Sequence, residues 1–138
     1  HRPDCRYGLS KAFTEDLAFL YAYKYGVRGF CMRIGSFTPT PTDARALSTW
    51  ISYRDMAQLV AVGLSAEYDH EIVYGISRNK RAWWDNSNAY RLGYEPLDQS
   101  EDYAKDVEHI RGDDPIAEEF QGSRFVSIEF TADPNNIP

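Results

Sequence analysis

The side chains best suited to chemistry in this sequence are Tyr7 and Lys11. Residues four apart lie on the same side of a helical turn, so the two can meet. An ammonium group beside a phenol favours the phenolate, and a tyrosine activated in this way can take a hydroxyl proton as hydride leaves the adjacent carbon. The alternative interpretation is an exposed tyrosine and lysine at a helix start, and the spacing alone does not separate the two.

The surrounding pattern predicts the elements that position this pair. Residues 10–25 have apolar side chains at spacings of three and four, which indicates a helix, and Gly26 suits the position just past its end. Residues 27–34 predict a short strand. Residues 37–42 contain two prolines and are expected to form a loop.

The rest of the chain continues to alternate between helices and strands. Ser52 suits the cap of a helix that reaches about Ala66. Its predicted buried stripe consists of Met56, Leu59, Val60 and Leu64. The remaining expected elements are a strand at 71–76, helices at 86–92 and 101–110, a weakly supported strand at 125–130 and an irregular tail to Pro138.

This order of elements predicts an α/β layer with parallel strands. Only two strands are clearly indicated, however, and a sheet of two strands is marginal by itself. Parallel strands also need both faces covered. No glycine-rich phosphate loop follows a strand in this sequence. The pattern therefore indicates part of a larger fold.

Composition excludes several classes of function. A hydrophobic content of 43% is enough for a core, and a formal net charge of −6 argues against nucleic acid as a partner. The sequence has no apolar run of membrane-spanning length and no signal-peptide pattern, so we expect no membrane contact and a cytoplasmic protein. Cys5 and Cys31 are expected to be free thiols, and the scattered histidines predict no metal site.

Several motifs occur in the order typical of one enzyme family. Tyr7 and Lys11 open a helix, residues 33–35 (Arg-Ile-Gly) close the next strand, and residues 50–55 (Trp-Ile-Ser-Tyr-Arg-Asp) lead into a second helix. From about residue 2 to 98 the chain resembles the extended short-chain dehydrogenase/reductase (NAD-dependent epimerase/dehydratase) family, and most of all its uronate dehydrogenases. The resemblance implies the C-terminal half of a Rossmann-like parallel-sheet dehydrogenase, with the nucleotide-binding N-terminal half absent.

The resemblance also implies roles for individual residues. Tyr7 and Lys11 would be the catalytic pair and, together with Phe37, would contact NAD. Ser36 and Arg45 would bind the sugar acid, and the forked guanidinium group suits a carboxylate. The structural alternatives are that Ser36 ends the strand and that Arg45 forms a surface pair with nearby Asp43. No metal ligand is implied.

The implied activity is NAD-dependent oxidation of a hexuronate, glucuronate or galacturonate, at C1 to an aldarolactone. One alternative is an NAD-dependent dehydrogenase of glucose 6-phosphate or another sugar, and another is a non-catalytic fragment or a subunit that completes a sheet. The expected partners are a small sugar acid and further copies in a homo-oligomer of the complete enzyme. Residues 1–98 are expected to form the second half of the dehydrogenase domain, and residues 99–138 an acidic, partly irregular extension.

Overall fold

The computed structural model describes residues 2–128, 130–133 and 135. Within these ranges no helix is long and apolar enough to cross a membrane. The same residues contain no group of three or more histidine, cysteine or acidic side chains that could hold a metal ion. Cys5 and Cys31 are both free, as the sequence predicts.

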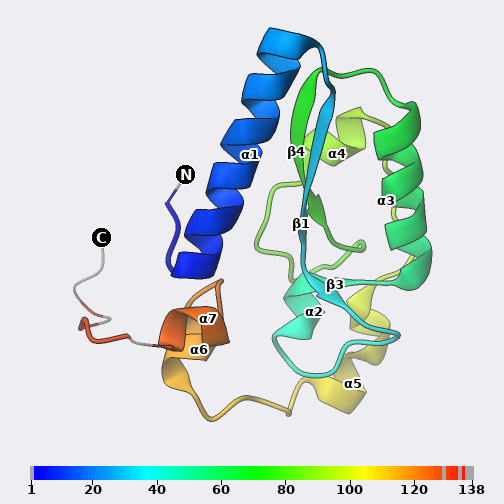
Figure 1. Ribbon diagram of the computed structural model, residues 1–138. Helices are drawn as coiled ribbons and strands as arrows, with labels where there is room; N and C mark the ends of the chain where they lie inside the picture. The colour runs from blue at the N-terminus through cyan, green and yellow to red at the C-terminus, as the bar shows by residue number, and fades with distance from the viewer. Residues whose placement is uncertain (1, 129, 134, 136–138) are drawn as a thin grey trace.

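Two parallel strands form the centre of the molecule, with a helix on either side (Figure 1). β1, Gly29–Ile34, pairs in parallel with β4, His70–Gly75, along the whole length of both strands. Helix α1, Arg6–Tyr25, packs on one side of this pair, and α3, Tyr53–Ser65, lies on the other. The predicted α/β class with parallel strands is confirmed.

The two ends of α1 are set by different caps. The Sγ atom of Cys5 accepts a hydrogen bond from the backbone N–H of Gly8 at 3.2 Å, so the helix begins earlier than the predicted Ser10. The predicted end at Gly26 is confirmed: this residue has a φ of 65°, in the left-handed region that glycine adopts without strain. The helix therefore includes both members of the candidate catalytic pair.

Helix α3 is capped as predicted, but only Met56 and Leu59 of its predicted buried stripe pack in the core. Ser52 Oγ accepts a hydrogen bond from Asp55 N at 3.0 Å. Leu59 is buried, whereas Val60 and Leu64 are 40% and 75% exposed. Each residue advances about 100° around a helix. An error of one position in the predicted stripe therefore places a side chain that was expected to be buried on a face that points away from the core. The larger core cluster consists of Ile51, Leu59, Val62, Val73, Ala89 and Tyr94.

A second, shorter parallel pair carries residues of the candidate site. β2, Ser36–Phe37, pairs with β3, Trp50–Ile51. Helix α2, Ala46–Thr49, leads directly into β3 and is entirely buried. A Cβ atom on Gly35 would lie 1.8 Å from the carbonyl oxygen of Thr49, so only glycine allows the backbone after β1 to approach α2.

The C-terminal part contains short helices. α4, Ser87–Arg91, is followed by Gly93 with φ 97° as predicted. The predicted helix at 101–110 is divided into a 3₁₀ turn, η1 at Ser100–Tyr103, and helix α5 at Ala104–Val107. Two further helices follow: α6, Pro115–Glu119, and α7, Arg124–Ser127. The expectation of an irregular tail is therefore wrong at α6, where the side chain of Asp114 caps a helical turn.

The strand expected at 125–130 is wrong, because Phe125 lies in α7. Short alternating segments do not distinguish a strand from one helical turn, and the packing of α7 against α6 favours the helix here. Glu129 of the expected strand lies outside the described residues, as do Pro134 and residues 136–138 of the predicted irregular tail. In Figure 1, α6 and α7 lie at the foot of α1.

Candidate active site

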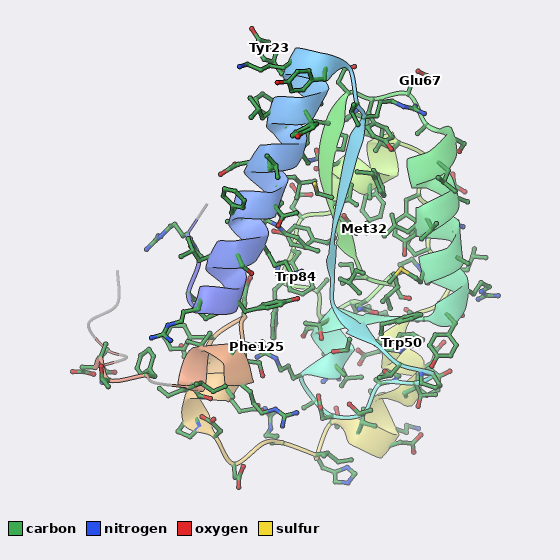
Figure 2. All side chains as sticks on the ribbon, viewed as in Figure 1. Tyr23, Met32, Trp50, Glu67, Trp84 and Phe125 are labelled. Atoms are coloured by element: carbon green, nitrogen blue, oxygen red, sulfur yellow. The ribbon has the colours of Figure 1, made fainter. Side chains whose placement is uncertain are left out.

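The predicted pair on α1 meets in space. The Nζ atom of Lys11 lies 5.3 Å from the centre of the Tyr7 ring. Tyr7 is 51% exposed, and its ring stacks on Phe125 of α7 with the centroids 4.6 Å apart and the planes inclined by 16°. Phe125, which lies on α7 near the foot of α1 (Figure 2), thus covers one face of the Tyr7 ring. A hollow of about 530 Å³ opens beside Tyr7, lined by residues 4–7 at the start of α1 and by Phe125, Val126, Ile128 and residues 130–132.

A bidentate ion pair ties α1 to the end of β1. Arg33 donates from Nε and Nη2 to the two carboxylate oxygens of Glu15, at 2.8 and 2.7 Å. A third hydrogen bond runs from Arg33 Nη1 to the hydroxyl of Tyr74 at 3.2 Å. The hydrogen bonds to Glu15 raise the pKa of Arg33 above its usual range. These bonds hold the helix that carries Tyr7 at a fixed position relative to the sheet.

The hydroxyl of Ser36 has a partner on α2. Ser36 Oγ and Thr49 Oγ1 are 2.9 Å apart, and Thr49 Oγ1 also lies 3.4 Å from the carbonyl oxygen of Arg45. Sequence reasoning gave no role to Thr49, because nothing in the sequence indicates that a short buried helix faces β2. The structure therefore connects Ser36 and Arg45, the two residues expected to bind the acid, through Thr49.

Phe37 lies apart from the pair on α1. It is 49% exposed, and its ring packs on Tyr53 at the start of α3 with the centroids 4.8 Å apart. Among the described residues, no hydrogen bond or ring contact joins Phe37 to Tyr7 or Lys11. The structure of this chain thus does not bring Phe37 together with the other residues expected to contact NAD.

The guanidinium group of Arg45 binds the backbone of the C-terminal segment rather than Asp43. Asp43 instead accepts a hydrogen bond from the N–H of Ala46, at 2.8 Å. Arg45 Nη1 donates to the carbonyl oxygens of Ala117 and Glu118 at 3.2 and 3.4 Å. Arg45 Nη2 donates to those of residues 120 and 121, at 2.9 and 2.7 Å. The alternative of a surface pair with Asp43 is therefore not observed.

An aromatic ring lies against the guanidinium group of Arg45. Its guanidinium carbon lies 4.8 Å from the centre of the Trp83 ring, a cation–π contact. Burial lowers the pKa of Arg45, and the nearby carboxylates of Glu118, Asp43 and Asp4 oppose that effect. Partial burial makes the positive charge effective at attracting an anion, because less water screens it.

The C-terminal segment 117–125 connects the two parts of the candidate site. Besides its bonds to Arg45 and the stacking of Phe125, Gly122 N donates to Asp4 Oδ2 at 3.1 Å. Trp84 Nε1 donates to the side-chain oxygen of Gln121 at 3.0 Å. Sequence reasoning assigned no functional residue beyond position 98. Single side chains meeting backbone carbonyls leave no periodic pattern in a sequence, so this connection could not be predicted.

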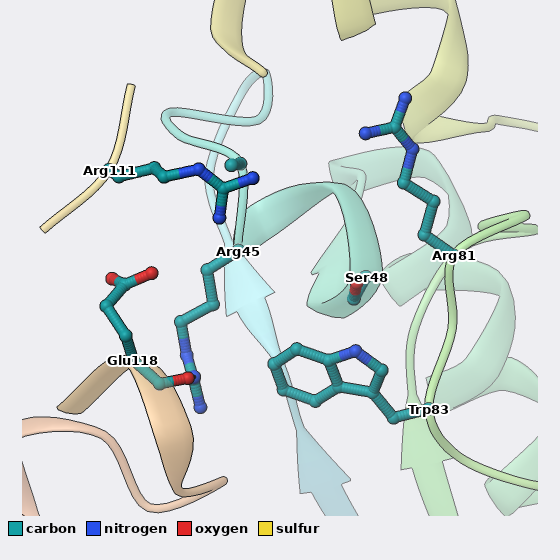
Figure 3. Close-up of a pocket in the computed structure, with 7 residues that line it drawn as sticks. Arg45, Ser48, Arg81, Trp83, Arg111 and Glu118 are labelled. Atoms are coloured by element: carbon teal, nitrogen blue, oxygen red, sulfur yellow. The ribbon is translucent and has the colours of Figure 1, made fainter. Parts of the chain in front are cut away.

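A cavity of about 240 Å³ lies beside Arg45 (Figure 3). Trp83 faces it, and arginine side chains approach it from several segments. The complete lining is Ala44, Arg45, Ser48, Arg81, Trp83, Arg111 and Glu118.

Comparison with known proteins finds relatives for most of this chain. No protein-family model matches it. The uronate dehydrogenase of Pseudomonas syringae is 43% identical over 129 residues, which are 91% of this chain and 47% of that protein. The uronate dehydrogenase of Pseudomonas putida is 48% identical over 108 residues, 78% of this chain and 40% of that protein. An NAD-dependent glucose-6-phosphate dehydrogenase of Haloferax volcanii is 38% identical over 113 residues, 79% of this chain and 43% of that protein.

Solved structures agree with the sequence relatives. The crystal structure of a uronate dehydrogenase variant from Agrobacterium tumefaciens, complexed with NAD, matches with a TM-score of 0.83 and 38% identity, over 91% of this chain and 49% of that one. These likenesses confirm the resemblance predicted from the motifs. The chain is homologous to the C-terminal half of the uronate dehydrogenases, and it spans about half the length of the relatives it matches.

Proposed function

We propose that this chain carries the proton-transfer and substrate-binding part of an NAD-dependent dehydrogenase that oxidises glucuronate or galacturonate at C1 to an aldarolactone. The observation that carries the proposal is the meeting of Tyr7 and Lys11 on α1, in a chain related to uronate dehydrogenases. The hollow beside Tyr7 leaves room for a substrate against its ring.

Tyr7 acts as the base in this proposal. Its oxygen takes the proton of the C1 hydroxyl, and Lys11, on the next turn of α1, holds a positive charge beside the ring. Stacking on Phe125 holds the ring in one orientation, so that the oxygen does not have to be positioned at each turnover. NAD, when bound, accepts the hydride that leaves C1.

The residues of this chain fit only part of that cofactor. Lys11 offers donors for the hydroxyls of the nicotinamide ribose, and Phe37 offers an exposed apolar ring. The sequence holds no glycine-rich loop between a strand and a helix, the usual site for the pyrophosphate. We therefore assign to this chain the nicotinamide end of the cofactor and no contact with the adenosine.

Ser36 and Arg45 bind the sugar acid in this proposal. The Ser36 hydroxyl, held by Thr49, can turn a donor or an acceptor toward a sugar hydroxyl. Arg45 contributes a partly buried positive charge. Its Nη donors already meet backbone carbonyls, so its attraction for the acid is mainly electrostatic as long as segment 117–121 stays in place.

A dehydrogenase of glucose 6-phosphate is the second candidate function, favoured by the identity with the Haloferax volcanii enzyme. An arginine-lined cavity suits a phosphate as well as a carboxylate.

For either substrate, we propose that the complete enzyme is a homo-oligomer. The exposed apolar side chains along α1, among them Phe13 and Tyr23 at 66% and 81%, provide a surface for such contacts.

A spectrophotometric assay tests the proposal directly. The full-length protein that contains this chain is mixed with NAD and, separately, glucuronate, galacturonate, glucose 6-phosphate and glucose. We expect NADH from the uronates only. NADH from glucose 6-phosphate alone would favour the second candidate, and no NADH from any sugar would leave the chain as a non-catalytic relative.

A further inference from the structure

Three side chains of α1 form a row along one side of the helix. Tyr7, Lys11 and Glu15 follow one another at intervals of four residues, so each lies about one turn beyond the last. The Nζ atom of Lys11 lies 5.3 Å from the centre of the Tyr7 ring. Glu15, at the other end of the row, is buried, with 7% of its surface exposed. Lys11 therefore stands between a phenol and a carboxylate, and its flexible stem allows it to turn toward either.

Arg33 of β1 neutralises this carboxylate. Its Nε and Nη2 atoms donate to the two carboxylate oxygens of Glu15, at 2.8 and 2.7 Å. A carboxylate taken out of water needs an opposite charge and hydrogen bonds at both oxygens, and a guanidinium fork supplies all of these. The positive charge that Glu15 requires is thus provided by Arg33 and does not have to come from Lys11.

The fork of Arg33 is held from the sheet and not from α1. Tyr74, the residue of β4 paired with Arg33 in the strand register, accepts a hydrogen bond from Nη1 at 3.2 Å. The guanidinium carbon also lies 5.7 Å from the centre of the Tyr74 ring. On that ring stacks Trp84, with the centroids 4.9 Å apart and the planes inclined by 4°. Arg33 therefore reaches Glu15 in an orientation that α1 does not set.

Loss of the charge at position 33 would change what Lys11 meets. Glu15 would keep its poorly hydrated carboxylate without the fork, one turn from the ammonium group of Lys11. Oppositely charged side chains four residues apart on a helix attract one another, and the attraction is stronger where water is excluded. Because Tyr7 and Glu15 lie on opposite sides of Lys11 along the helix, an ammonium group drawn to the carboxylate would leave the Tyr7 ring.

We propose that Arg33 is a positioning residue for the proposed reaction. By pairing with Glu15, it keeps the ammonium group of Lys11 beside Tyr7. The inference rests on the proposed function, because it matters for catalysis only if Tyr7 and Lys11 carry the reaction. In a purely structural role, the ion pair would only fasten α1 to β1. The positioning role differs in that the balance of charge at positions 15 and 33 matters, and not the ion pair itself.

Substitutions at the two positions in the full-length protein separate these roles. Arg33→Gln leaves the Glu15 carboxylate without its fork, Arg33→Lys keeps the charge but not the fork, and the double variant Arg33→Gln/Glu15→Gln has neither charge. Arg91→Gln is the matched control, because it breaks another arginine–glutamate pair, between α4 and β4. One readout is kcat for glucuronate oxidation. The other, taken without NAD or sugar, is the rate at which acetic anhydride modifies Lys11, measured by peptide mass spectrometry relative to Lys24 at the far end of α1.

We expect Arg33→Gln to lower kcat about ten-fold or more, a part of the roughly 100-fold or larger contribution of positioned acid–base groups. Acetylation of Lys11 should slow about two-fold or more, the effect of one ion pair at this spacing. Arg33→Lys and the double variant should keep both quantities within about two-fold of the original protein, because their charges balance. Arg91→Gln should behave as the original protein.

A double variant as slow as Arg33→Gln would show a purely structural role and overturn the inference, as would normal kcat and normal Lys11 acetylation in Arg33→Gln. If urea unfolding shows that Arg33→Gln does not fold, Arg33→Lys and the double variant still decide, since a low kcat in either contradicts the positioning role. Failure of the unsubstituted protein to oxidise glucuronate would overturn the proposed function instead, and the acetylation rates would still test the effect of Arg33 on Lys11.

Discussion

The hydroxyl of Tyr7 has the central role in the proposed chemistry, and its ring is restrained from two directions. Lys11 comes from the same helix, one turn later, and is fixed by the local spacing. Phe125 comes from a helix more than one hundred residues away in the chain. The first contact follows from the motif itself, whereas the second needs the C-terminal segment to fold back onto the start of α1.

Replacing Tyr7 with phenylalanine keeps the ring and its stacking but removes the proton acceptor. We expect turnover of uronates to fall at least ~100-fold, the usual contribution of a positioned acid–base group, while NAD binding is nearly unchanged. Steady-state kinetics and an NAD titration measure the two effects. Tyr23→Phe is the control, because Tyr23 is 81% exposed at the other end of α1. Equal activity of the two variants would contradict the assignment.

Gly35 is a second residue whose effect can be predicted. A methyl group there would collide with the carbonyl of Thr49, which lies in the short helix behind Ser36. We expect Gly35→Ala to lower the free energy of unfolding by about 2 kcal/mol or more, as forced overpacking does. Gly8→Ala is the comparison, since its added Cβ would meet only ordinary van der Waals contacts, with Pro3, Asp4 and Cys5 just before α1. Urea unfolding of both variants and of the original protein measures these free energies of unfolding.

At the scale of elements, α6 and α7 depend on a single side chain for much of their attachment. Arg45 binds four carbonyl groups between Ala117 and Gln121, and no periodic apolar stripe is needed to hold this segment in place. Such an attachment is sensitive to one substitution. The contacts that then remain include the anchor at Gly122, the hydrogen bond from Trp84 to Gln121 and the stacking of Phe125.

We therefore expect Arg45→Lys to release the segment in part, because a lysine has one point-like donor group instead of a fork. Hydrogen exchange should become faster at the amides of residues 117–126 and stay the same in β1 and β4. Mass spectrometry of deuterium uptake measures this. Arg91→Gln serves as the control, because it removes an arginine of α4 that pairs with Glu71 of β4, away from this segment. Equal exchange in Arg45→Lys and the original protein would show that other contacts hold the segment.

At the scale of the whole molecule, a polar network joins the start of α3 to residues that follow β4 in the chain. Asp98 accepts hydrogen bonds from Ser52 Oγ, at 2.6 Å, and from the guanidinium of Arg54. Buried Asp55 accepts from Ser77 Oγ and from the backbone N–H groups of Leu97 and Asp98. This network closes the end of the core that lies beyond β4.

Burial tends to raise the pKa of Asp98, but the bonds from Ser52 and Arg54 outweigh it and hold that pKa below its ordinary value of 3.8. The folded state therefore favours the ionised form. The resulting stability is present above the unfolded-state pKa and is lost as the pH falls through the lower folded-state value. We expect the difference in unfolding free energy between the original protein and Asp98→Asn to be constant near neutral pH and to narrow below about pH 4. A difference that does not change with pH would contradict this.

The sequence by itself determined the features that depend on local spacing. These include the Tyr7–Lys11 pair, the end of α1 at Gly26, the cap of α3 at Ser52 and the parallel α/β class. Each follows from side chains within a few residues of one another, or from the order of elements. The face of α3 that is buried was only partly predictable, because a three-to-four spacing fits neighbouring faces of a helix.

Only the tertiary structure decided which distant segments meet. Arg45 is directed to the carbonyls of 117–121, Phe125 to the ring of Tyr7, and Arg111 to the cavity that Trp83 lines. The physical reason is that every residue has the same backbone carbonyl, and a single aromatic contact produces no repeating pattern in the sequence. Which groups meet therefore depends on the packing of the whole chain, and the local sequence does not indicate it.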